Sequence, residues 1–347
     1  MTLRDKSFTL HDMQYVVRAA GLRGFGDLVR QLGGKPAALL AACQLPANAL
    51  DDEGALVDCR LGILLLERAA HALACPDFGL RLSARQDVGI LGPLAFALRH
   101  SATVGEGLEC ASRYFFVHSN AFLLSVARAS AKRGKMAELR FDLLAPDIPL
   151  ARQFWDVCLG TTCRVFRFLT RDAYPIRAAH FPHAPLAPVS TYRKQFGEAV
   201  LFEQAQAALL VDNASLEVPL NECNQMLKEM ALNYLDKNFA SAPSLSNRIR
   251  LALANALDSP QCGIEAMADL FNLHSRTLQR YLKAEGTSFE VLRDEARRDA
   301  ARRYLNSTRL PLAQVAGLLG LSEQSALTRA CKRWFDATPK AIRAQVQ

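Results

Sequence analysis

The clearest pattern of apolar and polar positions lies near the C-terminal end, where one short amphipathic pattern occurs twice. The two copies span residues 263–283 and 311–332, with equivalent positions about 48 to 50 residues apart. In each copy, apolar residues recur at helical spacing, stop at a short polar turn, and resume in a second amphipathic segment. The layout predicts two helix-turn-helix units, a motif whose second helix enters the major groove of DNA. The aligned apolar positions are Ile264, Met267, Ala268, Leu270 and Leu273 in the first copy and Leu312, Val315, Ala316, Leu318 and Leu321 in the second.

The second segment of each copy carries the candidate DNA contacts on the side opposite its apolar residues. Leu278 and Leu282 should face the core of the first unit, and Leu327 and Cys331 that of the second. The outward residues are Arg276, Gln279, Arg280 and Lys283 in the first unit, and Gln324, Ser325, Thr328, Arg329 and Lys332 in the second. Arg suits guanine and Gln suits adenine, whereas Lys more often holds phosphate. A surface salt bridge explains any single Arg equally well, but the repeated pattern favours DNA contacts.

Between the two copies, residues 289–306 predict an amphipathic helix. Its arginines are Arg293, Arg297, Arg298, Arg302 and Arg303, and its apolar side carries Leu292, Ala296, Ala300 and Leu305. We expect most of these arginines to be solvated and paired with Asp294, Glu295 or Asp299 at helical spacing. A stiff helix here would hold the two reading helices about one DNA turn apart, roughly 34 Å.

The pattern before residue 240 predicts an α+β domain with a small antiparallel sheet. Strands alternate apolar and polar residues, while helices repeat every three to four positions. Thr103 is a candidate helix cap, and Lys132–Lys135 is a candidate hairpin turn. The expected helices are 11–20, 24–33, 36–43, 58–74, 77–85, 89–100, 104–118, 149–170, 190–196 and 219–239, and the expected strands are 121–130, 136–144, 176–181, 200–202 and 207–211. The predicted domains are residues 1–240 (α+β), a linker at 241–247, and an all-α domain at 248–347.

The predicted helix at 219–239 has an apolar stripe that must be buried somewhere. The stripe consists of Cys223, Met226, Leu227, Met230, Tyr234 and Leu235. It could pack on its own domain or pair with a second subunit, and the sequence alone leaves both interpretations open. A homodimer is therefore one expected partner state.

Composition and charge support a cytoplasmic nucleic-acid-binding protein. The chain has 347 residues and a net charge of +8. Residues 247–347 hold 16 Lys and Arg against 10 Asp and Glu, so most of the excess lies on the repeated motif, where a polyanion would bind. The charged start is unlike a signal peptide, and the longest aliphatic run, near Leu61–Leu66, is too short to span a bilayer. Nine cysteines without a paired framework favour a reducing compartment, with buried thiols preferred over a redox sensor.

The C-terminal residues resemble the DNA-binding domain of the AraC/XylS family of bacterial transcription regulators. The matching residues are Leu278-Gln279-Arg280, Leu318-Leu319-Gly320-Leu321-Ser322, Leu327-Thr328-Arg329, Lys332-Arg333-Trp334-Phe335 and Thr338-Pro339 with Arg343. The resemblance implies base contacts at Arg276, Gln279, Arg280, Gln324, Ser325 and Arg329. Asp336 replaces the usual Gly, and Asp tolerates left-handed geometry, so we expect the turn to survive. Cys331 and Ala326 replace bulky aromatics, which implies a thinner core and a first unit that contributes more of the affinity.

The N-terminal residues resemble one branch of that family, whose arabinose-binding-like effector domain lacks the double-stranded β-helix of the arabinose sensor. The stretches that resemble it are Gly89–Leu94, Phe181–Pro185 and Tyr192–Gly197. The resemblance implies a regulator that binds double-stranded operator DNA, responds to a small-molecule effector, and contacts RNA polymerase if it is an activator.

Motifs for other chemistries are missing or incomplete. Gly21–Gly26 does not match the dinucleotide-binding pattern, and no phosphate-binding loop of the P-loop type is present, so no cofactor is expected. His180 and His183 lack a complete ligand set, which favours ordinary histidines over a metal site. No catalytic residues are predicted. Two alternatives remain: an enzyme with a DNA-targeting module, which would need an activated Cys, and a ligand-independent regulator whose N-terminal domain only dimerises.

Overall fold

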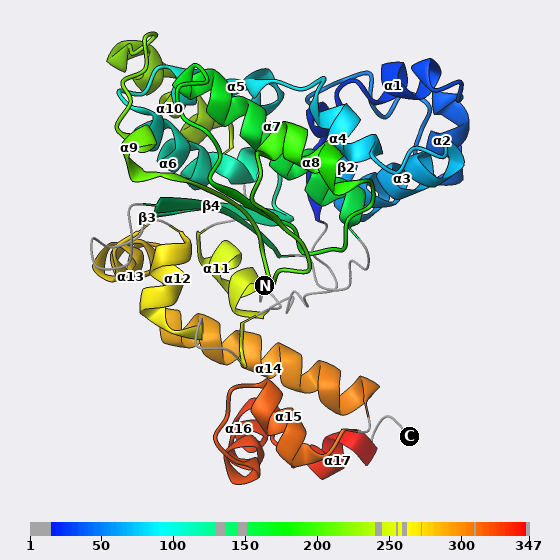
Figure 1. Cartoon of the computed structure of the whole chain (residues 1–347). Coiled ribbons are helices and arrows are strands. Elements are labelled where there is room, and N and C mark those ends of the chain that lie inside the picture. Colours follow the sequence, from blue (N-terminus) through cyan, green and yellow to red (C-terminus); the bar gives the residue numbers. More distant parts are fainter. Residues whose placement is uncertain are drawn as a thin grey trace. The chain divides into compact units, whose positions relative to one another are not determined.

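The computed structural model divides into two compact units, one that begins at Tyr15 and one that contains the C-terminal helices (Figure 1). The unit from Tyr15 onward combines helices with a small sheet, and the C-terminal unit is helical, which confirms the predicted fold class. The helices that the structure describes include none long and apolar enough to cross a membrane. The described residues are 15–128, 136–144, 151–239, 245–254, 256–258, 262–271, 273–308 and 310–344.

A five-stranded sheet lies at the centre of the N-terminal unit, in the order β3-β4-β7-β5-β6. Its strands are β3 (Phe122–Arg128), β4 (Met136–Leu143), β5 (Ala178–His180), β6 (Val200–Leu201) and β7 (Ala207–Asp212). β3 and β4 pair antiparallel, with Ser125 opposite Arg140, so the predicted hairpin is confirmed, although its turn at Lys132–Lys135 lies outside the described residues. β5 and β6 are parallel and the other pairs are antiparallel.

Helices cover this sheet, and α6 contacts β3 while α7 contacts β7. The α-helices are α1 (Phe25–Gln31), α2 (Pro36–Ala42), α3 (Cys59–Ala72), α4 (Phe78–Ser83), α5 (Pro93–Arg99), α6 (Val104–Tyr114), α7 (Arg152–Thr170), α8 (Val189–Phe196), α9 (Asn213–Leu216) and α10 (Gln225–Asn238). Short 3-10 helices are η2 (Ala19–Leu22), η3 (Val88–Leu91) and η4 (Phe115–Val117). Thr103 caps α6 as predicted, because its Oγ1 accepts a hydrogen bond of 3.2 Å from the Glu106 amide.

The helix predicted at 11–20 is wrong within the described residues. Val16–Arg18 forms strand β1, which pairs antiparallel with β2 (Leu56–Asp58), and η2 follows it. The Val16 amide also donates a hydrogen bond of 2.8 Å to the side chain of Asn120. Adjacent β-branched residues suit a strand, and distant partners in the chain decide the outcome over local periodicity.

The helix predicted at 219–239 begins later, at Gln225, because Asn224 caps it. Cys223 therefore lies outside the helix in an exposed segment. Within α10, the predicted stripe divides over two faces. Leu235 is buried on the side of the helix that contacts α5, whereas the side chains of Met226, Met230 and Tyr234 are 65%, 61% and 49% exposed.

The core of the N-terminal unit contains an apolar pocket between the helices and the sheet. Its wall includes Leu66 from α3, Leu108 from α6, Phe154 from α7, and Phe122 and Phe141 from the first two strands of the sheet. The centre of a water-sized molecule can occupy about 90 Å³ within it. This space is several times what a single water requires, so the core is packed around a cavity.

The C-terminal unit is a set of short helices arranged around one long helix. They are α11 (Leu245–Ala254), α12 (Ile264–Leu270), α13 (Ser275–Ala284), α14 (Phe289–Ser307), α15 (Leu312–Leu318), α16 (Gln324–Phe335) and α17 (Pro339–Ala344). α14 contacts α11, α15, α16 and α17 through a buried side that includes the predicted Leu292, Ala296, Ala300 and Leu305. α11 begins inside the segment interpreted as a linker.

Candidate nucleic-acid interface

The two copies of the sequence pattern fold with the same local hydrogen bonds. In the first, α12 leads into α13, and the Leu273 amide donates to the Ala268 carbonyl at 2.9 Å. In the second, α15 leads into α16, and the Leu321 amide donates to the Ala316 carbonyl, also at 2.9 Å. These bonds close the turn after each first helix. Both copies are therefore helix-turn-helix units with α13 and α16 as their second helices.

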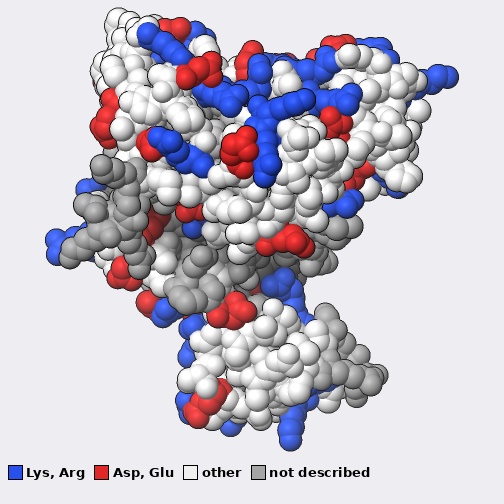
Figure 2. Space-filling view, in the orientation of Figure 1, with Lys and Arg blue, Asp and Glu red and all other residues white. Residues whose placement is uncertain are grey.

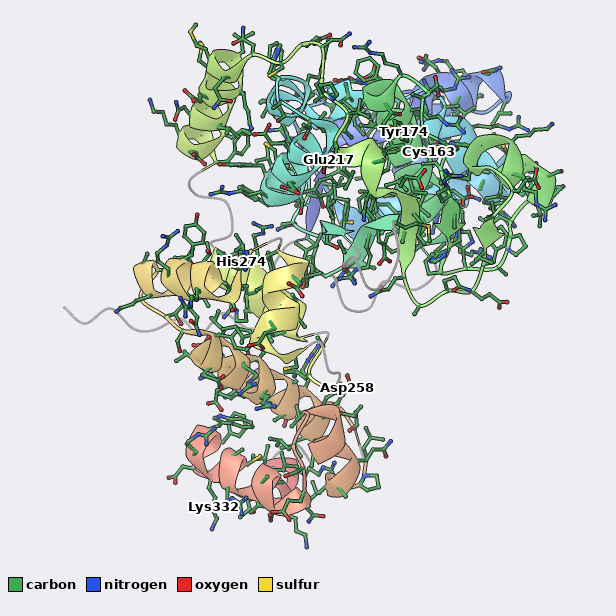
Figure 3. The ribbon with its side chains drawn as sticks, turned by 60° about the vertical axis from the view of Figure 1, so that its left-hand side comes forward. Cys163, Tyr174, Glu217, Asp258, His274 and Lys332 are labelled. Atoms are coloured by element: carbon green, nitrogen blue, oxygen red, sulfur yellow. The ribbon has the colours of Figure 1, made fainter. Side chains whose placement is uncertain are left out.

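The apolar and polar sides of α13 and α16 lie where the sequence pattern predicted them. Leu278, Leu282, Leu327 and Cys331 are fully buried. The exposed residues are Arg276, Gln279, Arg280 and Lys283 on α13, and Gln324, Ser325, Arg329 and Lys332 on α16. Figure 3 shows Lys332 on the outer side of its helix. Thr328 is half-buried, and its hydroxyl donates to the Gln324 carbonyl at 3.1 Å, so it is the least accessible of the nine candidates.

The two outer faces differ in how their cations are held. On α13, no described residue forms an ion pair with Arg276, Arg280 or Lys283. On α16, Glu323 lies just before the helix, 3.7 Å from the Arg329 guanidinium, and it also accepts a hydrogen bond from Ser325. A phosphate or base that binds Arg329 must compete with this carboxylate. Figure 2 shows mostly uncharged surface on the visible side of the second unit, with both basic and acidic residues at its margin.

The long helix α14 is joined to the second unit by polar contacts across helices. Asp294 accepts hydrogen bonds from the Arg333 guanidinium and, at 2.8 Å, from the indole of Trp334. Arg333 and Trp334 belong to α16, so the pair fixes this helix against α14. Charge-assisted hydrogen bonds are stronger than neutral ones and add a preferred orientation to the packing of the two helices.

The expected pairing of the α14 arginines with Asp294, Glu295 or Asp299 at helical spacing is not found among the described residues, since the one such ion pair joins neighbours in the sequence. Arg298 lies 3.6 Å from Asp299, but Arg297 donates to the carbonyls of Leu319 and Gly320 at 3.0 and 3.1 Å. Those carbonyls follow the end of α15, where backbone acceptors lack helical partners. Arg302 lies over the Phe335 ring at 5.1 Å. These two arginines serve the fold of the second unit, and their partners are too distant in sequence for helical spacing to indicate.

Two turn residues adopt left-handed backbone conformations that position α16. Gly320 has a φ of +62°, and a Cβ there would overlap the Leu257 carbonyl oxygen, so only glycine fits. Asp336 ends α16 with a φ of 53° and a ψ of 25°, which confirms that Asp supports the turn in place of Gly.

Several cysteines are buried in surroundings that disfavour the thiolate form. All nine cysteines are free. Burial raises the pKa of Cys59 to about 12 and those of Cys163 and Cys331 to about 11, the opposite of what a nucleophilic thiol needs. His183 is buried beside Asp156, with 3.4 Å between Nε2 and Oδ1. Among the described residues, no cluster of three or more His, Cys, Asp or Glu could hold a metal ion.

The family of the chain follows from two matches to family models. One, described as the arabinose-binding domain of AraC transcription regulators (N-terminal), matches residues 33–220, more than half of the chain, and a helix-turn-helix domain matches residues 267–345. The chain belongs to the AraC family of transcription regulators. Both matches, like the relatives below, are to transcription regulators rather than enzymes.

Relatives of this AraC-family chain are similar over nearly its full length. The HTH-type transcriptional regulator VirS of Mycobacterium tuberculosis is 37% identical over 95% of this chain and 96% of that protein. An ornithine utilization regulator of Pseudomonas aeruginosa is 28% identical over 91% of this chain and 93% of its own length. The crystal structure of the transcriptional regulator CdpR from Pseudomonas aeruginosa covers 91% of this chain and 97% of its own, at 24% identity and a TM-score of 0.45.

Proposed function

We propose that this AraC-family regulator reads two adjacent major grooves of its operator, with α13 in one groove and α16 in the next. The observation that carries the proposal is the matched pair of helices, each with a buried apolar side and exposed Arg and Gln on the other. α14 joins them and is 19 residues long, or about 28 Å at 1.5 Å per residue. That length suits two reading helices about one DNA turn, roughly 34 Å, apart.

Within this proposal, the residues divide by chemistry. Arg276, Arg280 and Arg329 suit guanine, and Gln279 and Gln324 suit adenine. Ser325, Thr328, Lys283 and Lys332 complete the proposed contacts with base edges or phosphates. The cations of α13, which form no ion pair with a described residue, should contribute more affinity than the second unit, whose Arg329 lies beside Glu323.

The test is a titration of a duplex that the wild-type protein has selected from a random library. Arg280→Ala and Arg329→Ala should each cost about 1–3 kcal/mol in specific binding, or roughly five- to 150-fold in affinity, at one salt concentration. Arg60→Ala, an exposed arginine of the N-terminal unit, is the matched control and should change nothing. Unaltered affinity in both variants would remove the assigned contacts.

We further propose that the N-terminal unit binds a small-molecule effector and shifts the population of DNA-competent arrangements in the cytoplasm. The apolar pocket in its core supports this role, because it is a place where a ligand could bind. Such a ligand would shift the equilibrium only if it bound one of the two states more tightly than the other. We also propose that two copies of the chain pair through the exposed stripe of α10. If the protein is an activator, it should contact RNA polymerase as well. If the N-terminal unit only dimerises, no ligand will alter DNA affinity.

A further inference from the structure

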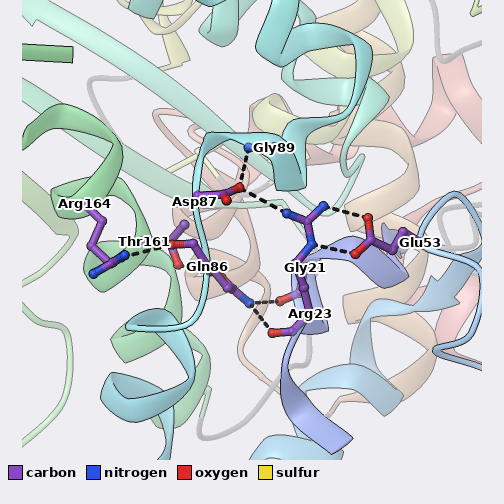
Figure 4. Close-up of polar contacts among 8 residues, drawn as sticks. All are labelled: Gly21, Arg23, Glu53, Gln86, Asp87, Gly89, Thr161 and Arg164. Atoms are coloured by element: carbon purple, nitrogen blue, oxygen red, sulfur yellow. Dashed lines mark hydrogen bonds and ion pairs between the residues drawn. The ribbon is translucent and has the colours of Figure 1, made fainter. Parts of the chain in front are cut away.

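The pocket in the N-terminal unit has almost no unmatched polar groups. Gln86 lies in its wall, but its side-chain amide donates to the Gly21 carbonyl at 2.9 Å and accepts from the Thr161 hydroxyl at 2.7 Å (Figure 4). Thr162, also in the wall, donates to the Cys158 carbonyl at 2.8 Å. These polar residues are therefore occupied by the protein itself and have little to offer a ligand.

His118 is different from the other polar residues of the wall. Its side chain is buried, and Nδ1 has no hydrogen-bond partner among the described residues. Burial, together with the positive charge of Arg18, lowers the pKa of the ring to about 4, so the imidazole is neutral at physiological pH. The ring also interacts with the backbone of Ile90. Nδ1 is itself enclosed by protein, so the neutral ring brings neither a charge nor an accessible nitrogen at that position to the pocket.

The pocket wall carries no formal charge. Its described lining residues include no Asp, Glu, Lys or Arg, and the thiols of Cys59 and Cys158 have raised pKa values because they are buried. A charged ligand would lose its hydration without gaining an ion pair. A sugar or amino acid presents several polar groups, each of which would lack a partner here.

The size of the pocket limits the ligand further. A 150 Å³ apolar cavity engineered in another protein binds benzene, and the space here is about 90 Å³. One aromatic ring or a short aliphatic chain therefore fits after a small outward movement of the wall. Ile90 and Leu91 of η3 form part of that wall. The outer side of the same segment, at Val88 and Gly89, lines a surface groove that offers a route of entry.

We infer that this pocket binds a small, uncharged and mainly apolar molecule, because its accessible wall is almost wholly apolar. The inference rests on the proposed effector control and names the chemical class of its ligand. The wall thus selects against a sugar, although the matching family model is described as arabinose-binding. It selects equally against a charged amino acid.

Thermal unfolding of the full chain with phenol, toluene, benzoate, L-arabinose or L-ornithine tests this inference. Phenol and toluene should raise Tm by binding the folded state, and the other three probes should not. Binding of benzoate, arabinose or ornithine, or the absence of a Tm shift with both phenol and toluene, would overturn the inference.

Two substitutions show whether the probes occupy this pocket. Ala111→Leu fills it and should abolish both shifts. Gly62→Ala adds a single methyl group, 3.8 Å from a Val17 methyl, and should weaken both probes even if the larger substitution fails to fold. Phe96→Ala, an exposed residue of the outer groove, is the matched control and should change neither shift. Shifts that survive Gly62→Ala and disappear in Phe96→Ala would place the probes in the groove instead.

DNA titrations with the same probes separate this inference from the proposed effector control. Phenol that binds the pocket without changing DNA affinity would end the effector proposal and leave the ligand class standing. A charged probe that changes DNA affinity would support effector control and contradict the ligand class.

Discussion

Gly320 is the residue whose replacement should most directly damage the second reading unit. Its φ of +62° costs an alanine about 1–2 kcal/mol, and the added Cβ would overlap the Leu257 carbonyl oxygen. Overpacking of this kind typically costs a further 1–3 kcal/mol. Gly320→Ala should therefore lower the free energy of unfolding of the C-terminal unit by about 2–5 kcal/mol.

Urea unfolding followed by tryptophan fluorescence measures this loss. The chain has two tryptophans, so a Trp155→Phe background leaves Trp334 of α16 as the single reporter. With a slope of about 1–3 kcal/mol per molar urea, the midpoint should fall by at least about 0.7 M. Gly317→Ala is the matched control: its Cβ meets nothing within 4 Å, and alanine in α15 should stabilise by up to ~1 kcal/mol. Equal midpoints for Gly320→Ala and its parent would refute the reasoning.

Three further predictions concern other parts of the chain. Because His118 has a pKa of about 4 when folded and an ordinary value of 6.5, its contribution of roughly 3 kcal/mol to the free energy of unfolding is complete above pH 6.5 and is lost as pH falls toward 4. In His118→Gln the urea midpoint should therefore depend less on pH between 6.5 and 4. A pH dependence equal to that of the wild type would contradict the burial argument. Met230→Glu should halve the mass seen in sedimentation if the α10 stripe joins two copies, and a wild-type mass would reject that interface. Glu323→Gln should strengthen DNA binding by releasing Arg329, whereas weaker binding would show that the carboxylate helps to position it.

The helices α13 and α16 were predictable because their information is local. Buried leucines at helical spacing and outward Arg and Gln define each helix without reference to distant residues. The second copy of the pattern then excludes coincidence. The turn at Asp336 was predictable through the family resemblance, which has a glycine at this position, together with the tolerance of Asp for left-handed geometry.

Other features could not be predicted because their partners are far away in the sequence. Val16–Arg18 reads as part of a helix until its pairing with Leu56–Asp58 is known. Arg297 reads as a solvated cation, yet its partners are backbone carbonyls beyond the end of α15, which carry no sequence signal. The pocket escapes detection for a similar reason. Residues such as Leu108 and Phe154 are apolar whether they fill a core or line a cavity.

The most direct test of two-groove reading is a base-contact footprint on the selected duplex, compared between two double variants. The wild type should protect two patches about 10 base pairs apart on one face of the DNA. Arg276→Ala with Arg280→Ala should erase one patch and cost more affinity, and Gln324→Ala with Arg329→Ala should erase the other. A single patch in the wild type, or loss of the same patch in both variants, would contradict reading by both helices.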